Sequence, residues 1–448
     1  MNIEKLEVRA PHSESMRIQC SVTDHLVSNI PVTVGFFYSC QIAKETLLQG
    51  LRQVLSDYPL FAGRLCKTEA GLTIVCNNQG LEFSVEQEGC NIETALYTLL
   101  DDIPEIEVFD IIDTSKVIEE QSALSTCKVI YYGDGAMSLG FCWHHVLGDM
   151  HSFMHFMKAF SNAVAGKNSV KPIIVSDRPA YLNQHIDDTT GGNASIRCIN
   201  EEERAELMQY MLSQAPNKKR IQFYFTDNEL KALKRIYNER SELPLSTNDA
   251  LCAHMFSIMT ECADDNKSRC LSIAINFRPR IPLPEDLLGN LISSINIDTT
   301  PDEQQQSTFI AKKIRNSINR YKEHIDYHAN NRVIEEQGGM TSISQFIPKA
   351  LDPIQGMFLV TNWSKFGVYD IDFGKQAPFY FTQRSSAPFP WMSSIVDGFG
   401  NSGLLFNSNL PTEVTNKLVE PKVLQKIHQY REPDEEIPNI LQRLSWIN

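Results

Sequence analysis

The chain has 448 residues, of which 42% are hydrophobic and 21% are charged, and its formal net charge at pH 7 is −14. This composition is typical of a globular protein and excludes disordered, collagen-like and coiled-coil chains. An acidic chain also lacks the clustered Lys and Arg with which proteins bind nucleic-acid phosphates. At about 150 residues per domain, the length predicts two or three domains.

Eleven cysteines are scattered along the chain, and none forms a Cys-x-x-Cys pair. Several lie inside apolar runs, which indicates reduced, buried thiols in a cytoplasmic protein. The first residues, MNIEKLEVRAPHSE, contain no apolar segment of a signal peptide, and no run of 18 apolar residues predicts a membrane span. We therefore expect a cytoplasmic monomer that neither spans a membrane nor binds nucleic acid.

In the first half of the chain, strand and helix patterns alternate. Residues 30–40 (IPVTVGFFYSC) are rich in β-branched and aromatic residues and predict a buried strand, and residues 44–55 carry leucines at helical spacing. Residues 127–132 and 137–143 flank a Gly-Asp-Gly turn, which predicts a hairpin. Apolar residues at helical spacing over 153–164 then predict a helix. The alternation indicates a mixed α/β layer.

The second half repeats this kind of pattern after a long crossover at 165–198, which contains turn-forming residues such as DDTTGGNAS. Residues 246–260 predict a helix, residues 271–277 and 291–297 predict strands, and residues 308–327 predict a charged surface helix. We expect a first domain over 1–175, a linker over 176–215 and a second domain over 216–448.

The most informative segment is WHHVLGDMH at 143–151. It follows a hydrophobic strand and precedes an amphipathic helix, and such a turn can hold a side chain rigidly toward a cleft. An imidazole in this turn, with an ordinary pKa of about 6.5, can take up a proton at neutral pH.

The residues of this segment alone leave three other readings open. His144, His145, Asp149 and His151 could ligate a metal, because His and Asp are metal ligands. Asp149 could cap the following helix by accepting an amide of its first turn. The paired histidines could also fill a polar corner at the end of the strand.

The pattern His145-x-x-x-Asp149 resembles the active-site motif of the BAHD CoA-dependent acyltransferases, and with His144 it is also similar to the HHxxxD of peptide-synthetase condensation domains. Further segments follow in BAHD order along nearly the whole chain. They are LRQVLSDYPLFAGRL at 51–65, STNDALCAH at 246–254, NFRPRI at 276–281 with Gly289-Asn290, TNW at 361–363 and YDIDFG at 369–374.

The resemblance implies an α/β fold with mixed sheets, in which two similar domains like chloramphenicol acetyltransferase enclose an active-site channel. It also implies that the segment at about 355–378 packs with the first domain. The implied activity is transfer of an acyl group from acyl-CoA, as co-substrate, to a hydroxyl or amine of a small molecule, and the resemblance implies no metal and no permanently bound cofactor. Acceptors in specialised metabolism fit this family best.

The resemblance also implies a role for each matching residue. His145 is the expected general base, the Thr361 hydroxyl stabilises the oxyanion, and Trp363 orients the intermediate. Asp149 is expected to point away from the substrate and to pair with Arg278. The remaining expected roles are structural support by Asp372, at a strand end, and by Gly374, and contacts with CoA by Ser246 and Thr247, although an N-cap role explains these last two equally well.

The chain departs from the family pattern at two places. Met150 follows the motif aspartate where glycine is usual, and this could narrow the donor channel. The segment DFGKQAP at 372–378 lacks the tryptophan and second glycine of DFGWGKP, so we expect altered packing in a divergent member. Two alternatives remain: an enzyme of condensation-domain type that uses a carrier-bound thioester, and a non-catalytic binding protein on the same fold.

Overall fold

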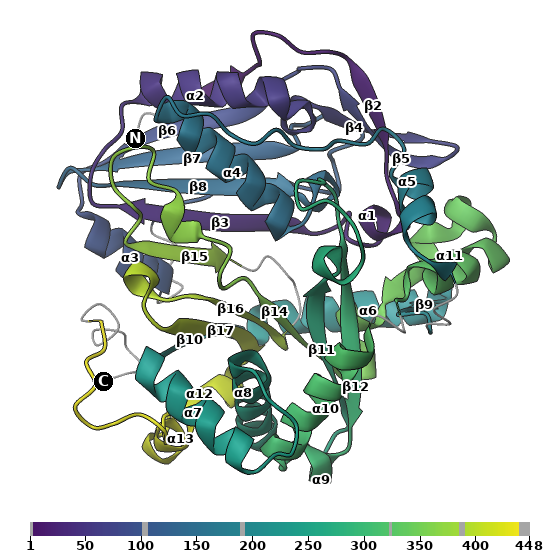
Figure 1. The fold of residues 1–448 in the computed structure, drawn as a ribbon, viewed down its shortest axis with the longest axis vertical. Coiled ribbons are helices and arrows are strands. Elements are labelled where there is room, and N and C mark those ends of the chain that lie inside the picture. Colours follow the sequence, from purple (N-terminus) through teal and green to yellow (C-terminus); the bar gives the residue numbers. More distant parts are fainter. Residues whose placement is uncertain (1–2, 101–105, 189–192, 322–324, 385–389, 439–448) are drawn as a thin grey trace.

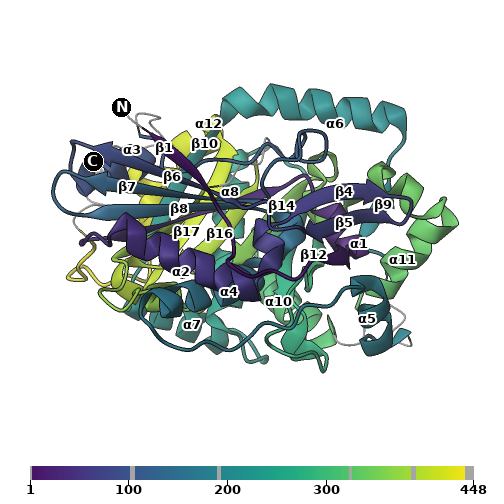
Figure 2. The ribbon, with the colours of Figure 1, turned by 90° about the horizontal axis from the view of Figure 1, so that it is seen from above.

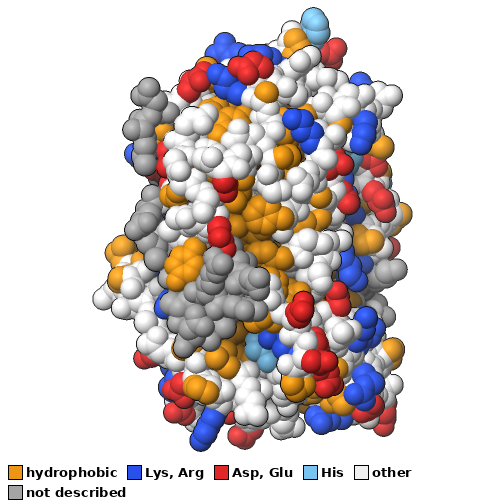
Figure 3. All heavy atoms as spheres, turned by 90° about the vertical axis from the view of Figure 1, so that its left-hand side faces the viewer, with side chains coloured by type: hydrophobic (Ala, Val, Ile, Leu, Met, Phe, Trp, Pro, Cys, Tyr) orange, Lys and Arg blue, Asp and Glu red, His pale blue; other side chains and the backbone are white. Residues whose placement is uncertain are grey.

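The computed structural model describes residues 3–100, 106–188, 193–321, 325–384 and 390–438. Two six-stranded mixed sheets dominate this part of the chain, one in the upper and one in the lower half of Figure 1. On the side that is at left in Figure 1, hydrophobic side chains gather at mid-height (Figure 3).

The first sheet is built around the predicted hairpin. In spatial order its strands are β1 (Glu4–Val8), β6 (Leu81–Glu88), β7 (Ser125–Tyr132), β8 (Met137–His144), β3 (Pro31–Tyr38) and β15 (Tyr380–Arg384). All residues of β7 and β8 are buried, as expected for continuous apolar runs inside a sheet. β15 comes from the second half of the chain and pairs antiparallel with β3.

The second sheet contains only strands from the second half of the chain. Its spatial order is β10 (Lys218–Phe225), β17 (Leu404–Pro411), β16 (Met392–Asp397), β14 (Met357–Asn362), β11 (Arg269–Asn276) and β12 (Ile292–Thr299). Two smaller sheets complete the described strands: β2 (Met16–Gln19), β5 (Gly71–Cys76) and β4 (Arg64–Thr68) form one, and β13 (Phe346–Pro348) with β9 (Ile196–Cys198) the other.

Helices cover the outer faces of both sheets (Figures 1 and 2). On the first sheet these are α2 (Lys44–Asp57) and α4 (Met150–Val164), and on the second α7 (Asp227–Glu239), α8 (Thr247–Ala263), α10 (Ser307–Arg320) and α12 (Thr412–Leu418). The other α-helices are α1 (Val22–Leu26), α3 (Ile92–Leu100), α5 (Arg178–His185), α6 (Glu201–Gln214), α9 (Pro301–Gln304), α11 (Tyr327–Glu336) and α13 (Pro421–Ile427). Within the described ranges, no helix is long and apolar enough to cross a bilayer.

The predicted strands and helices are present, with one correction. The single surface helix expected over 308–327 is wrong, because α10 ends at Arg320 and a separate helix, α11, begins at Tyr327. Asp326 lies between them outside either helix and is buried against β12 through Ser293. A tertiary contact of this kind has no signature in helical periodicity.

The segments expected to link or join the domains have their own structure. The stretch 176–215 contains α5, β9 and α6, and α6 buries none of its side chains and stands out from the molecule (Figure 2). Within 355–378, β14 belongs to the second sheet, whereas Phe373 packs between Tyr38 and Phe160 on the side of the first sheet. The domain boundaries themselves stay a prediction.

Candidate active site

The motif turn joins the central strand β8 to α4. Aromatic packing sets its position, because the Trp143 ring stacks on Phe153 of α4 with 3.9 Å between centroids and its indole N–H donates to the carbonyl of Gly148 at 3.0 Å. Gly148 has φ +152°, and a Cβ there would lie 2.6 Å from the Cβ of Ser152. The turn therefore requires glycine at this position.

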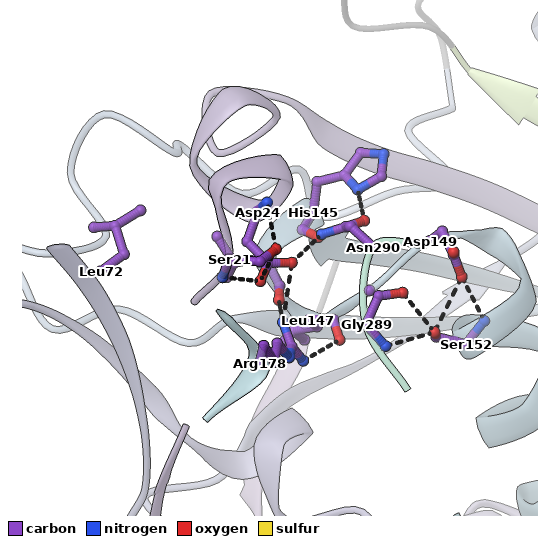
Figure 4. Close-up of polar contacts among 12 residues, drawn as sticks. Ser21, Asp24, Leu72, His145, Leu147, Asp149, Ser152, Arg178, Gly289 and Asn290 are labelled. Carbon is purple, nitrogen blue, oxygen red and sulfur yellow. Dashed lines mark hydrogen bonds and ion pairs between the residues drawn. The ribbon is translucent and has the colours of Figure 1, made fainter. Parts of the chain in front are cut away.

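His145 begins the turn, directly after the last residue of β8. Its Nδ1 lies 2.8 Å from Oδ1 of Asn290, and the Asn290 amide nitrogen donates to the backbone oxygen of His145 at 2.7 Å (Figure 4). Since Oδ1 of Asn290 can only accept a hydrogen bond, Nδ1 of His145 carries the hydrogen. The Nε2 atom of the neutral ring therefore keeps a free lone pair. Burial lowers the pKa of His145, which keeps this neutral form present at neutral pH.

A buried carboxylate holds Asn290 in that orientation. The Asn290 amide nitrogen also donates to Oδ1 of Asp24 at 2.7 Å, and Asp24 forms an ion pair with Arg178 at 3.0 Å. Arg178 donates in turn to the backbone oxygens of Val146 and Leu147 in the motif turn. Because Asp24 can only accept, the amide cannot rotate by 180° without losing this bond (Figure 4).

Asp149 points away from His145 and is buried with Arg278. The two side chains form a bidentate ion pair, with N–O distances of 2.6 and 3.1 Å. Asp149 also accepts the backbone N–H of Ser152 and so caps α4, and it accepts the N–H of Leu291. Burial would raise the pKa of its carboxyl, but Arg278 and the Ser152 N–H hold that pKa below its ordinary value.

The neighbouring histidines have different surroundings. His144 is buried, its Nδ1 accepts the N–H of Val146, and burial lowers its pKa to about 3, so it fills a polar corner as a neutral side chain. His151 lies 2.7 Å from the backbone oxygen of Glu285. Across the described ranges, no three His, Cys, Asp or Glu side chains form a group that could hold a metal ion.

A cavity of about 270 Å³ opens beside His145. Both sheets contribute to its lining, and Thr361 and Trp363, at and just after the end of β14, lie on its wall together with His145. The Thr361 hydroxyl forms no hydrogen bond with any described residue. Met150 also lines the cavity, so the residue that replaces the usual glycine occupies space next to the motif turn.

The other expected site residues lie away from this cavity. Asp372 is in a turn after a short 3-10 helix, not at a strand end, and its carboxylate accepts the N–H of Gly374. Gly374 has φ +71° and approaches Ala165 so closely that a Cβ would lie 2.8 Å from that side chain. Ser246 is the N-cap of α8, with Thr247 as its first residue, and neither lines the cavity.

Sequence reasoning missed three residues that surround the base. Asn290 belongs to the Gly289-Asn290 segment of the family pattern, and its only signal in the sequence is an amide side chain that follows a glycine. Arg178 lies in a stretch expected to be a linker, and Asp24 lies near the N-terminus in a Ser-x-x-Asp capping box. Helix and strand periodicity do not reveal the roles of Arg178 and Asp24, because both residues contact partners that are distant in the sequence.

The chain is similar to known proteins in both sequence and fold. The model of the "Transferase" family matches residues 5–419. Agmatine coumaroyltransferase-1 of Hordeum vulgare is 23% identical over 389 residues, covering 83% of this chain and 85% of that protein. Crystalline TRI101 of F. graminearum with ethyl coenzyme A superposes with a TM-score of 0.72 at 14% identity, covering 92% of this chain and 99% of that chain.

Vinorine synthase superposes with a TM-score of 0.67 at 18% identity, over 95% of this chain and 98% of that chain. These likenesses confirm the predicted fold class of two acyltransferase domains built on mixed sheets. The family match, which extends over most of the chain, confirms the resemblance seen in the motifs. The chain belongs to the Transferase family, that of the BAHD proteins, and is an acyl-CoA-dependent acyltransferase.

Proposed function

We propose that the protein transfers an acyl group directly from acyl-CoA to a hydroxyl or amine of a small specialised metabolite, with His145 as general base. The observation that carries this proposal is the hydrogen bond from His145 Nδ1–H to Asn290, which leaves the Nε2 lone pair available on a residue that lines the cavity. A base of lowered pKa that is neutral at physiological pH suits this task.

The proposed step balances without a covalent enzyme intermediate. His145 Nε2 takes the proton of the acceptor as its oxygen or nitrogen attacks the thioester carbonyl carbon. The new C–O or C–N bond forms, the C–S bond breaks, and the imidazolium gives its proton to the CoA sulfur. Acyl-CoA is a co-substrate here, and the residues of the chain only move the proton and stabilise charge.

Thr361 is the proposed donor to the oxyanion that forms during this step. Thr361 lines the cavity, and its hydroxyl has no described partner that would compete. One such donor is typically worth about 2.7–4 kcal/mol of transition-state stabilisation. Trp363, which lines the same cavity, is proposed to orient the intermediate. The ion pair of Asp149 with Arg278 is proposed to hold the turn that carries His145.

The proposal also includes the compartment, the oligomeric state and the domain boundaries. All eleven cysteines are free thiols and seven are buried, which is consistent with action in the cytoplasm. We propose a monomer, with domains over 1–175 and 216–448 joined by 176–215. Contacts of Ser246 and Thr247 with CoA have no support in the cavity lining, whereas capping of α8 by Ser246 is observed directly.

The test measures release of free CoA thiol from a panel of acyl-CoA donors, with acceptor product followed by mass spectrometry. His145→Ala is expected to lose turnover by about 10²–10⁴-fold, the usual contribution of a general base, while acyl-CoA still binds. The matched control is His185→Ala, an exposed histidine on α5. Equal turnover of His145→Ala and the wild type would refute the proposed base.

A further inference from the structure

The cavity beside His145 contains a second carboxylate, Asp326. It directly precedes α11 and is 7% exposed. Its Oδ1 accepts the hydroxyl of Ser293 at 2.7 Å, and its Oδ2 lies 3.3 Å from the amide nitrogen of Asn330. The Ser195 side chain is a further hydrogen-bond donor to this carboxylate. All three donors are neutral, and no Lys, Arg or His of the described residues forms an ion pair with Asp326.

This arrangement differs from that of the other buried acids. Six of them form an ion pair with a basic side chain: Asp24 with Arg178, Glu86 with Lys128, Asp149 with Arg278, Glu229 with Arg431, Asp249 with Arg315 and Asp352 with Arg197. Asp397 forms none, but both its oxygens accept the backbone N–H of Lys365, and it does not line the cavity.

A buried carboxylate without a cation is costly, because water no longer solvates its charge. Burial accordingly raises the pKa of Asp326. A cation supplied by a ligand would remove this cost. Among the residues that line the cavity, Asp149 is already paired with Arg278, so it does not compete for such a ligand. Arg384 is paired with Glu107, so it does not compete with the ligand for Asp326.

The lining of the rest of the cavity indicates which kind of molecule could carry this cation. Apolar side chains such as Leu26, Ile275 and Leu359 make up much of the wall, so a hydrocarbon spacer fits between the polar ends. His145 and Asp326 line the same cavity of about 270 Å³. One group of the ligand can thus reach the base while a second group reaches the carboxylate.

We propose that the acyl acceptor is an amino alcohol or a diamine, whose protonated amine pairs with Asp326 while its other end presents the nucleophile to His145. This rests on the proposed function and names the substrate class of that site. We assign the cation to the acceptor, because the acceptor also carries the nucleophile that His145 deprotonates, and Asp326 lines the same cavity as that base. The amine at Asp326 stays protonated and is not the group acylated.

The test compares two acceptors of equal length, 6-amino-1-hexanol and 1-heptanol, in which an ammonium replaces a methyl group. With acetyl-CoA and p-coumaroyl-CoA as donors, the wild type is expected to favour the amino alcohol by at least about tenfold in kcat/KM, the worth of one charge-assisted bond. Asp326→Asn, which keeps the shape, should raise KM for the amino alcohol by a similar factor and leave 1-heptanol unchanged.

Asp326→Glu, which keeps the charge, should retain the preference, and Glu336→Gln, at an exposed acid that ends α11, should behave as wild type. Equal kcat/KM for the two acceptors, or a preference for hexane-1,6-diol over the amino alcohol, would overturn the proposal. Neither result affects thiol release with other acceptors, so the proposed function would stand.

A binding measurement needs no turnover. Titration of the wild type with 1,6-diaminohexane should raise its melting temperature, whereas equal concentrations of 1-hexanol should not. If the diamine gives no shift, or the same shift with Asp326→Asn, the pairing is refuted even when no acceptor in the panel is acylated.

Discussion

The ion pair between Asp149 and Arg278 gives the sharpest test of how the motif turn is held. We consider Asp149→Asn, which keeps the size of the side chain but removes its charge, and Arg278→Met, which keeps much of its length. Both residues are buried, at 3% and 2% exposure, so either single change leaves an uncompensated charge out of contact with water. Breaking such a pair typically costs about 3–5 kcal/mol.

The size of the thermal effect follows from the length of the chain. At about 2.1 cal/mol/K per residue, 448 residues give an unfolding entropy of about 0.9 kcal/mol/K at the melting temperature. Each single variant should therefore melt about 3–5 °C below the wild type. The double variant should lose less than the sum of the two, with a coupling energy of about 0.5–3 kcal/mol.

The assay is calorimetric melting of the four proteins, with turnover measured on the same preparations. Turnover should fall together with stability, because Asp149 caps α4 and accepts the N–H of Leu291, next to Asn290. The control is His145→Ala, which should lose turnover with little change in melting temperature. Strictly additive losses in the double variant, or lost turnover at unchanged melting temperature in Asp149→Asn, would refute a structural role of the pair.

Three further predictions concern the same turn. The pKa of Asp149 is lowered in the folded state, so its ionised carboxylate stabilises the fold at pH values above its ordinary pKa of 3.8. This stabilisation is lost as the pH falls through the lowered pKa. On acidification, the melting temperature of Asp149→Asn should therefore fall by less than that of the wild type. Asn290→Ala should lower kcat by about 10–100-fold, which is the usual effect of removing a residue that orients a functional histidine. An unchanged kcat would contradict the assigned tautomer of His145. Gly148→Ala should destabilise by about 1–3 kcal/mol through backbone strain and contact with Ser152, and denaturant titration that shows no loss would argue against the positive φ.

Much of the fold was predictable because strand and helix periodicity are local. The hairpin around Gly133 and the two helices α2 and α4, which pack together on one face of the first sheet, follow from apolar spacing and turn residues alone. The end of α10 at Arg320 and the start of a separate helix at Tyr327 were not predictable, because the apolar spacing over 308–327 contains no signal for the tertiary contact of Asp326 with Ser293. The pairing of β15 with β3 also escaped prediction, since these strands come from opposite halves of the chain.

The sequence by itself determined the family, the class of reaction and the residue expected to act as base, because ordered motifs along nearly the whole chain resemble one family. Only the tertiary structure decided which nitrogen of His145 is free, because the residues that settle it are distant in sequence. Asn290 meets His145 across 145 residues and Asp24 across 266. A hydrogen bond of this kind depends on how the sheets and helices pack, and packing brings Asp24, Arg178 and Asn290 to one point although no local pattern in the chain relates them.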